Sequence, residues 1–374
     1  MTTRKLYHGE KLQNIANYPC LTGFFPGDGS KKPLIAFIPG AAVLARFSYG
    51  GHDNCVSQHF LAHWFNSYGY GFLGISYPID SEPELLPPVG AEFNTHDWGR
   101  QSAAAIKDTI EENKLDTNQV VVLGWSMGGR SVEPLTVECK ALGIEVVLFV
   151  ALAATPALHG LLAMRGSARP TMTAAGYWDL KAIFNFFAFQ IKEQEQRHNG
   201  NKSIIDAQTL NEEYFGAMPA NHSGMGCRYD KALHKLVEED GPSTEEFGCV
   251  NFRNLPYLAC IYPSSGLDLR HTLTDKATWG FLMTFMLMSK LEGLQRPSNG
   301  RSYPEQLELL SRENELFEQL QQLIHDVPNR MSGRVQGNHF FFVGERGAKE
   351  TAELVLRFLR ESSTIRATVE KLSL

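Results

Sequence analysis

Several features that would assign a chain to a particular class are missing from these 374 residues. Lysine and arginine number 35 against 41 aspartates and glutamates, so the basic excess typical of binding to nucleic acid or to an anionic membrane is absent. The longest apolar run, residues 279–288, is too short to span a bilayer and is better explained as a buried helix. We therefore expect no membrane span and no nucleic-acid partner.

Signatures of metals, cofactors and secretion are also missing. None of the six cysteines forms a CxxC pair, and scattered single cysteines fit a reducing compartment. The metal motif HExxH and the nucleotide motifs GxGxxG and GxxxxGK[ST] do not occur. The opening stretch, MTTRKLYHGEK, lacks the apolar core of a secretory signal. We predict a cytoplasmic protein that uses neither a metal nor a cofactor.

What the sequence does contain is an alternation of short apolar runs with segments of helical spacing. Continuous apolar runs separated by helices are typical of a parallel sheet whose two faces are both covered. The fold class we expect is α/β, with a mostly parallel central sheet flanked by helices. The predicted strands cover 33–40, 71–78, 119–125, 145–154, 255–263 and 333–342, and the predicted helices cover 56–70, 98–114, 128–143, 274–293, 304–324 and 347–362.

The alternation breaks between residues 157 and 253, where no strand pattern is evident. An aromatic, helix-like stretch at 177–191 lies in this segment, among polar stretches. We predict a helical cap or lid, 157–253, inserted into one core that is formed by 1–156 and 254–374. Whether the residues before Lys31 add antiparallel edge strands stays open.

Residues 120–129, VVVLGWSMGG, form an apolar strand that runs into a turn with Ser126 at its centre. Gly124 and Gly128 have to approach each other too closely in such a turn for either to carry a Cβ. The turn lifts a serine hydroxyl clear of the backbone, where a neighbouring base can activate it. The alternative is an ordinary glycine-rich turn in which Ser126 caps the next helix.

With these residues the chain resembles the α/β-hydrolase family over its sheet-forming parts, about 33–155 and 255–362. The resemblance implies a catalytic serine, an acid and a histidine in that order along the chain. Ser126 in GWSMG matches the nucleophile, and His339 in QGNHFF matches the general base.

The resemblance places the acid in the loop after the penultimate strand, YPSSGLDLRHTLTD. Asp268 follows a glycine there and matches the residue that orients the histidine. Asp275 is the alternative acid, and Asp326 is a more distant one.

The remaining site residues also follow from the resemblance. The backbone N–H groups of Met127 and Ala41 match the oxyanion hole, and that of Met127 points at the site because it begins a helix. Many family members have His-Gly before the second donor, whereas this chain has Pro-Gly. Candidate substrate contacts are Gly40, Trp125 and Arg46, although a solvated loop side chain is the favoured explanation for Arg46.

These matches imply a serine hydrolase that cleaves a small-molecule carboxylic ester or thioester through an acyl-enzyme. The serine at the turn disfavours the aspartate-type epoxide hydrolase and dehalogenase chemistry of the family. Apolar residues in the insertion and in 274–290 favour a substrate with an apolar portion. The alternatives are an acyltransferase or lyase with the same triad, and a non-catalytic small-molecule-binding protein of this fold. The amphipathic segment 304–325 packs on the core or on another subunit, so a homodimer is possible.

Overall fold

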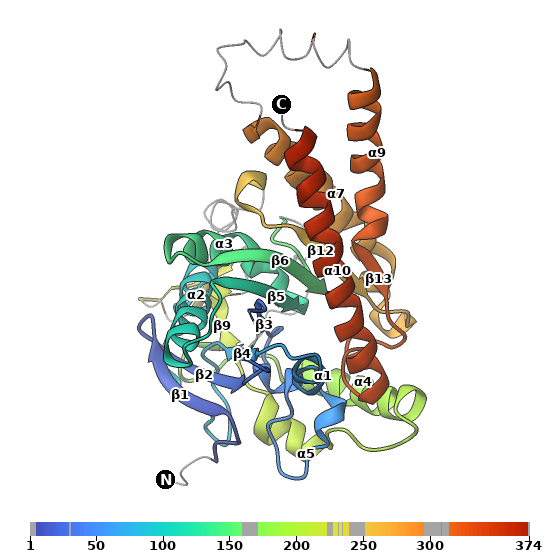
Figure 1. Ribbon diagram of the computed structural model, residues 1–374. Coiled ribbons are helices and arrows are strands. Elements are labelled where there is room, and N and C mark those ends of the chain that lie inside the picture. Colours follow the sequence, from blue (N-terminus) through green and yellow to red (C-terminus); the bar gives the residue numbers. More distant parts are fainter. Residues whose placement is uncertain are drawn as a thin grey trace.

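The computed structural model describes residues 5–29, 31–158, 171–222, 227–230, 232–233, 235–238, 251–294, 308 and 314–372. Its centre is an eight-stranded sheet with the strand order β1-β2-β4-β3-β5-β6-β12-β13 (Figure 1). The six strands from β4 to β13 run parallel to one another. The strand bounds are β1 Glu10–Ile15, β2 Tyr18–Phe25, β3 Leu34–Ile38, β4 Phe72–Ser76, β5 Gln119–Trp125, β6 Glu145–Leu152, β12 Leu258–Tyr262 and β13 Ser332–Arg334.

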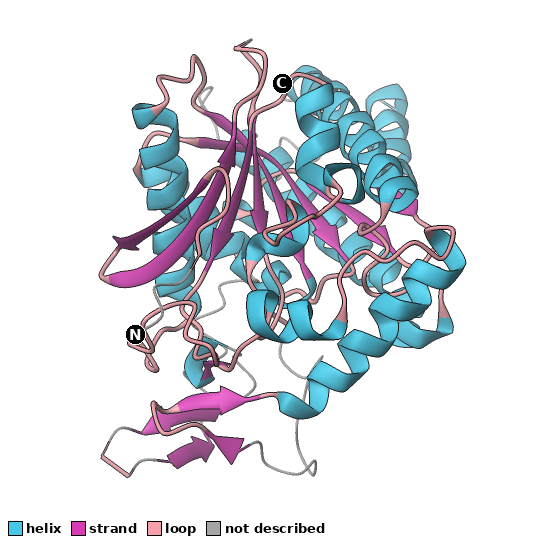
Figure 2. Ribbon diagram, turned by 90° about the horizontal axis from the view of Figure 1, so that it is seen from below, coloured by secondary structure: helices cyan, strands magenta, loops and turns pink. Residues whose placement is uncertain are grey.

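Helices cover both faces of this sheet (Figure 2). α2 packs on α3, α1 packs on α10, and α7 packs on α9 and β12. All residues of β3 and β4 are buried, which explains why these strands read as continuous apolar runs in the sequence. The predicted α/β class is confirmed. The helix bounds are α1 Leu61–Ser67, α2 Thr95–Glu112, α3 Val132–Ala141, α7 Leu269–Leu294, α9 Asn314–Arg330 and α10 Glu345–Leu372.

The structure answers one question about the sheet that the sequence left open, and it corrects the predicted last strand. The N-terminal residues form the hairpin β1–β2, and β2 pairs antiparallel with β4, so antiparallel edge strands are present. The strand predicted for 333–342 ends at Arg334, and the rest is a tight turn. Gly337 takes a φ of +138° there, and the Asn338 side chain accepts a hydrogen bond from the N–H of Phe340, a geometry that a strand does not allow.

The segment between the neighbouring strands β6 and β12 contains strands as well as helices. The expectation of a strand-free, helical insertion is therefore wrong for its described residues. Its strands are two to four residues long, too short to give an alternating pattern in the sequence. The elements are β7 Thr171–Met172, β8 Tyr177–Asp179, α4 Lys181–His198, α5 Ala207–Thr209, β9 Met218–Pro219, β10 Cys227–Asp230 and β11 Lys235–Glu238.

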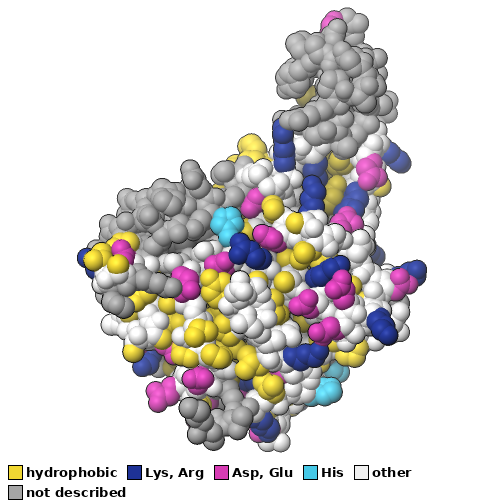
Figure 3. All heavy atoms as spheres, turned by 90° about the vertical axis from the view of Figure 1, so that its left-hand side faces the viewer, with side chains coloured by type: hydrophobic (Ala, Val, Ile, Leu, Met, Phe, Trp, Pro, Cys, Tyr) yellow, Lys and Arg dark blue, Asp and Glu magenta, His cyan; other side chains and the backbone are white. Residues whose placement is uncertain are grey.

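This insertion is attached to the loops that follow two sheet strands. Val43, after β3, forms an isolated bridge with Phe215, and Asp80, after β4, forms one with Ala217. Among the described residues, no helix is long and apolar enough to cross a membrane. On the face shown in Figure 3, acidic and basic side chains are interspersed, in keeping with the balanced composition.

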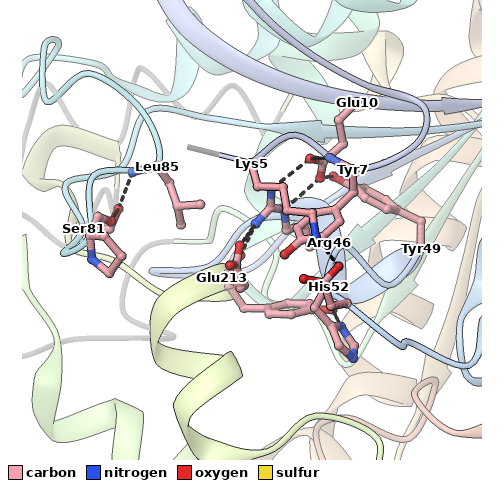
Figure 4. A network of polar contacts seen from close by, with 12 residues as sticks. Lys5, Tyr7, Glu10, Arg46, Tyr49, His52, Ser81, Leu85 and Glu213 are labelled. Atoms are coloured by element: carbon pink, nitrogen blue, oxygen red, sulfur yellow. Dashed lines mark hydrogen bonds and ion pairs between the residues drawn. The ribbon is translucent and has the colours of Figure 1, made fainter. Parts of the chain in front are cut away.

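A buried ion pair joins the N-terminal hairpin to the loop after β3 and to the insertion (Figure 4). The Arg46 guanidinium donates two hydrogen bonds of 2.8 Å to the two carboxylate oxygens of Glu10, and both side chains are 0% exposed. It also donates to the carboxylate of Glu213, at 2.5 Å. Tyr49 donates its hydroxyl to Glu10 at 2.8 Å. Arg46 therefore has a structural role, and the structure does not support a contact between its side chain and substrate.

We expect Glu10→Ala to lower the free energy of unfolding by about 3–5 kcal/mol, because it leaves the buried Arg46 guanidinium without its main counter-charge. Glu112→Ala is the control, since Glu112 pairs with Lys11 on the exposed surface and should contribute at most about 1 kcal/mol. Urea denaturation of the three proteins measures both differences. Equal, small losses in the two variants would contradict the structural role of the Arg46 pair.

Candidate active site

Ser126 lies on a strained turn directly after β5. Its φ of +53° is in the left-handed region, while Trp125 before it is extended and a 3₁₀ turn, Ser126–Ser131, follows. A Cβ on Gly124 would lie 2.4 Å from a ring atom of Phe149 and 3.0 Å from the carbonyl oxygen of Gly128. The close approach that the sequence predicts between the two glycines is therefore present, and it leaves room for no side chain.

Two peptide groups beside Ser126 have unused donors. A Cβ on Gly40 would lie 2.8 Å from the Cβ of Ser126, so the loop after β3 runs directly against the serine. Among the backbone hydrogen bonds of the described residues outside helices and strands, none has the N–H of Ala41 or Met127 as its donor. Free N–H groups flanking a serine are what an oxyanion hole requires. The assignment of Ala41 and Met127 to that role stays a prediction.

His339 and Asp268 meet through a hydrogen bond of 2.7 Å between Nδ1 of the histidine and Oδ2 of the aspartate. Asp268 ends a 3₁₀ turn, Gly266–Asp268, after β12, and His339 lies in the turn after β13. Because β12 and β13 are parallel neighbours, their carboxyl ends bring these two turns together. The side chains of His339 and Asp268 are only 9% and 11% exposed.

The electrostatics of this pair favour an ionised acid. Burial opposes ionisation of Asp268, but the charge and hydrogen bond of His339, with His271 and Arg270 nearby, outweigh it and hold the pKa of Asp268 below its usual value. The two alternative acids, Asp275 and Asp326, bond to residues other than His339. Both carboxylate oxygens of Asp275 bond to His271, and Asp326 bonds to Gln322 on its own helix.

Trp125 connects the serine turn to the histidine turn. Its indole Nε1–H donates to the carbonyl oxygen of His339 at 3.1 Å, and the two rings are 5.3 Å apart. Ser126 is the next residue, so its turn and that of His339 are held against each other. Trp125 is 0% exposed. A direct contact with substrate, as the sequence suggested, is therefore not supported for Trp125, whereas Gly40 does lie beside Ser126.

No protein-family model matches this sequence, and a comparison with curated proteins finds no match. Solved structures do match. An epoxide hydrolase from Vigna radiata is similar with a TM-score of 0.52 and 12% identity, covering 96% of this chain and 100% of that one. The chain has the α/β-hydrolase fold.

Two further structures show weaker similarity. One is an esterase from Pyrobaculum calidifontis, with a TM-score of 0.42, 15% identity and coverage of 96% of this chain and 86% of that chain. The other is a thioesterase domain from the curacin biosynthetic pathway, with a TM-score of 0.44, 10% identity and coverage of 94% and 100%. At 12% identity, the likeness to the epoxide hydrolase shows the fold alone and leaves the activity to be argued from the site.

The insertion of this α/β-hydrolase fold contacts both loops of the His339–Asp268 pair through helix α4. The ring of Phe187 stacks on that of His339, with centroids 6.2 Å apart and planes 27° apart. Gln190 donates its side-chain amide to the carbonyl of Leu267, the residue before Asp268. Next to His339, the Asn338 amide donates to the carbonyl of Gln190 and to the Glu193 carboxylate, both at 2.7 Å.

Sequence reasoning missed these α4 residues. Glutamines and glutamates on a helix usually indicate a solvated face. No local sequence pattern distinguishes the ones whose side chains contact a neighbouring loop. Gln190 and Glu193 are nevertheless buried, at 0% and 9% exposed. Their burial beside the two loops is the signal, and it exists only in the folded chain.

A second cluster of ionisable groups, Arg270, His271 and Asp275, lies next to the His339–Asp268 pair. Arg270 donates through Nη2 to the hydroxyl of Thr155 at 2.7 Å and to Nε2 of His271 at 2.5 Å. Nε2 of His271 therefore carries no proton, and its Nδ1–H donates to Asp275. Thr155 in turn donates its N–H to the carbonyl of Ser126, at 2.9 Å. The cluster links the serine turn to the helix that follows Asp268.

Metal binding fits this cluster poorly. Asp268, His271 and His339 each offer a ligand atom, all within 4.8 Å of one another. However, Arg270 and Asp275 take both ring nitrogens of His271, and Asp268 takes Nδ1 of His339. A cation here would have to displace the Arg270 guanidinium, which repels it.

We expect Gly40→Ala to disturb the serine more than the fold. Its Cβ would meet the Ser126 side chain, so the rate at which a fluorophosphonate probe labels Ser126 should fall at least about tenfold. The free energy of unfolding should fall by about 1–3 kcal/mol. Gly266→Ala is the control, because its Cβ would meet no atom within 4 Å. Labelling of Gly40→Ala at the wild-type rate would contradict the observed contact.

We expect Asp275 to make stability fall with rising pH. Burial raises its pKa to about 8 and lowers the pKa of His271 to about 4. Between pH 6.5 and 8 the folded chain holds a proton on Asp275 that the unfolded chain has released, so the free energy of unfolding falls as pH rises through this window. Asp275→Asn removes that fall.

Urea denaturation of wild type and Asp275→Asn at pH 6.5, 7.2 and 8 measures the difference. The stability of the variant relative to wild type should rise steadily with pH. Asp326→Asn, at the surface of α9, controls for removal of a carboxylate. A difference that stays constant with pH would show that Asp275 is ionised throughout.

Proposed function

We propose that the chain is a serine hydrolase that cleaves a carboxylic ester or thioester through an acyl-enzyme. Ser126 is the nucleophile, His339 the general base and Asp268 the acid that orients it. The observation that carries the proposal is the left-handed serine turn packed beside a histidine–aspartate hydrogen bond at one edge of the sheet. A strained serine, a base and an orienting acid are the parts that acyl transfer needs.

The mechanism follows from these contacts. Because Nδ1–H of His339 donates to Asp268, the Nε2 lone pair is available to take the proton of the Ser126 hydroxyl. The serine oxygen attacks the substrate carbonyl, and the N–H groups of Met127 and Ala41 stabilise the oxyanion. His339 returns the proton to the leaving alcohol or thiol, and then activates water to release the acid. Asp268 stays ionised and stabilises the imidazolium.

Aromatic rings around His339 support a substrate with an apolar portion. The ring of Phe187 lies 6.2 Å from that of His339 and 5.2 Å from that of Phe340, measured between centroids. Phe215 stacks edge-on against Phe184 at 5.3 Å and contacts Phe187. Most of these rings belong to the insertion, so residues 157–253 are proposed to act as a cap over a core of 1–156 and 254–374. A cytoplasmic location and a cofactor-free reaction belong to the same proposal.

Fluorophosphonate labelling tests the proposal. Wild type should react stoichiometrically and Ser126→Ala not at all, because the probe needs an activated serine. His339→Ala should slow labelling by at least about 100-fold, and Asp268→Asn should slow it as well. Asp275→Asn separates the two candidate acids, since it should label close to the wild-type rate. A chain-length series of ester and thioester substrates then defines the acyl group.

Other outcomes would replace the proposal. Labelling of Ser126 with slow hydrolysis but fast transfer to an added alcohol or thiol would indicate an acyltransferase. A folded wild type that resists labelling but gains melting temperature with small acyl ligands would indicate a binding protein. Equal loss in Asp268→Asn and Asp275→Asn would disprove the assignment of the acid.

A further inference from the structure

A cleft of about 710 Å³ lies at the opposite edge of the sheet from Ser126. Its walls include the residues at which β6 begins and those just before β12, together with parts of α3, α7 and α10. Ser126, Asp268 and His339 all follow the carboxyl ends of strands, so the sheet separates the two sites. The volume is in the range of small-molecule pockets.

Positive charge is in excess in this cleft. Its lining includes four cationic side chains but only two carboxylates, Glu145 and Glu370. Glu145 is already engaged, since it accepts from Arg366 at 2.6 Å and from Gln119 at 2.9 Å. Within the part of the chain that the structure describes, no carboxylate lies within 4.0 Å of the other three cations. These are Lys140, Arg253 and Lys290.

Lys290 is partly buried, whereas Lys140 and Arg253 are exposed. Its ammonium donates to one neutral group, the carbonyl of Leu255, at 3.1 Å. Lys290 and Arg366 both lie over the ring of Tyr257, at 5.1 and 5.2 Å from its centroid. Burial, together with the positive charges of Arg366 and Lys140, lowers the pKa of Lys290 to about 8. A partly buried cation in this position gains from an anionic partner.

The helix dipole does not explain why these cations gather in the cleft. A cation is stabilised by the helix dipole only within the last turn, and this explains Lys140 near the end of α3. Arg366 lies more than one turn from the end of its helix, because α10 continues to Leu372. Lys290 lies about one turn from the end of α7, which continues to Leu294. Arg366 and Lys290 converge from two different helices on one ring. Such convergence indicates a built site for negative charge.

We propose that this cleft binds a small molecule carrying phosphate groups, with Lys290 and Arg366 contacting the phosphates and Tyr257 forming the wall beneath them. The site is separate from the proposed hydrolase site, and the inference does not depend on that function. Closely spaced negative charges suit it best, because Lys290 and Arg366 both lie over the ring of Tyr257.

Isothermal titration calorimetry with pyrophosphate in 0.15 M NaCl tests the proposal. We expect binding to wild type and a loss of at least about tenfold in affinity in Lys290→Met, because one charge-assisted contact is removed. Lys349→Met is the matched control, since Lys349 also lies over an aromatic ring, that of Trp64, but outside the cleft. It should bind as wild type does.

Glu145→Gln keeps the test decisive if removal of a cation disturbs folding. Removing the carboxylate that competes for Arg366 should tighten pyrophosphate binding by about two- to fivefold. Three outcomes would overturn the proposal: no binding to wild type, unchanged affinity in Lys290→Met, or an equal loss in Lys349→Met. The last would indicate only non-specific attraction to surface charge.

Discussion

The left-handed turn at Ser126 is the constraint on which the arrangement of this site depends. A residue with a side chain pays a conformational cost at a φ of +53°, and the turn persists because its surroundings are filled. The loop after β3 runs against the serine at Gly40, and Gly124 leaves no space for a Cβ. Thr155 holds the serine carbonyl through its N–H. The packing of the neighbouring strands thus keeps the hydroxyl at the edge of the sheet.

A parallel sheet makes this edge chemically useful, because strands far apart in the chain end side by side there. Asp268 and His339 are 71 residues apart in sequence and 2.7 Å apart in the structure. The register of β12 against β13 sets their approach, from Cys260 opposite Ser332. Helix α4 of the insertion completes the arrangement by bonding to the loop before Asp268 and to Asn338. The insertion therefore positions the pair as well as lying beside it.

The edge where the strands begin has a different character. Helices α3, α7 and α10 line its cleft together with the start of β6 and the segment before β12, and the charged residues there are mostly positive. The chain as a whole is acidic, with a net charge of −6, so this local surplus is hidden in the composition.

The sequence by itself determined the strand and helix alternation and the turn at Ser126, because apolar periodicity and glycine spacing are local properties of the chain. His339 became a candidate only through the resemblance to the α/β-hydrolase family. The same resemblance singled out the loop after β12 as the place of the proposed acid, with Asp268 and Asp275 as alternatives. Only the tertiary structure separated them, since Asp268 faces His339 while Asp275 faces His271. The same holds for the burial of Arg46 and for the contacts of α4. Such pairings depend on where distant loops meet to within an ångström, and no local pattern encodes that distance.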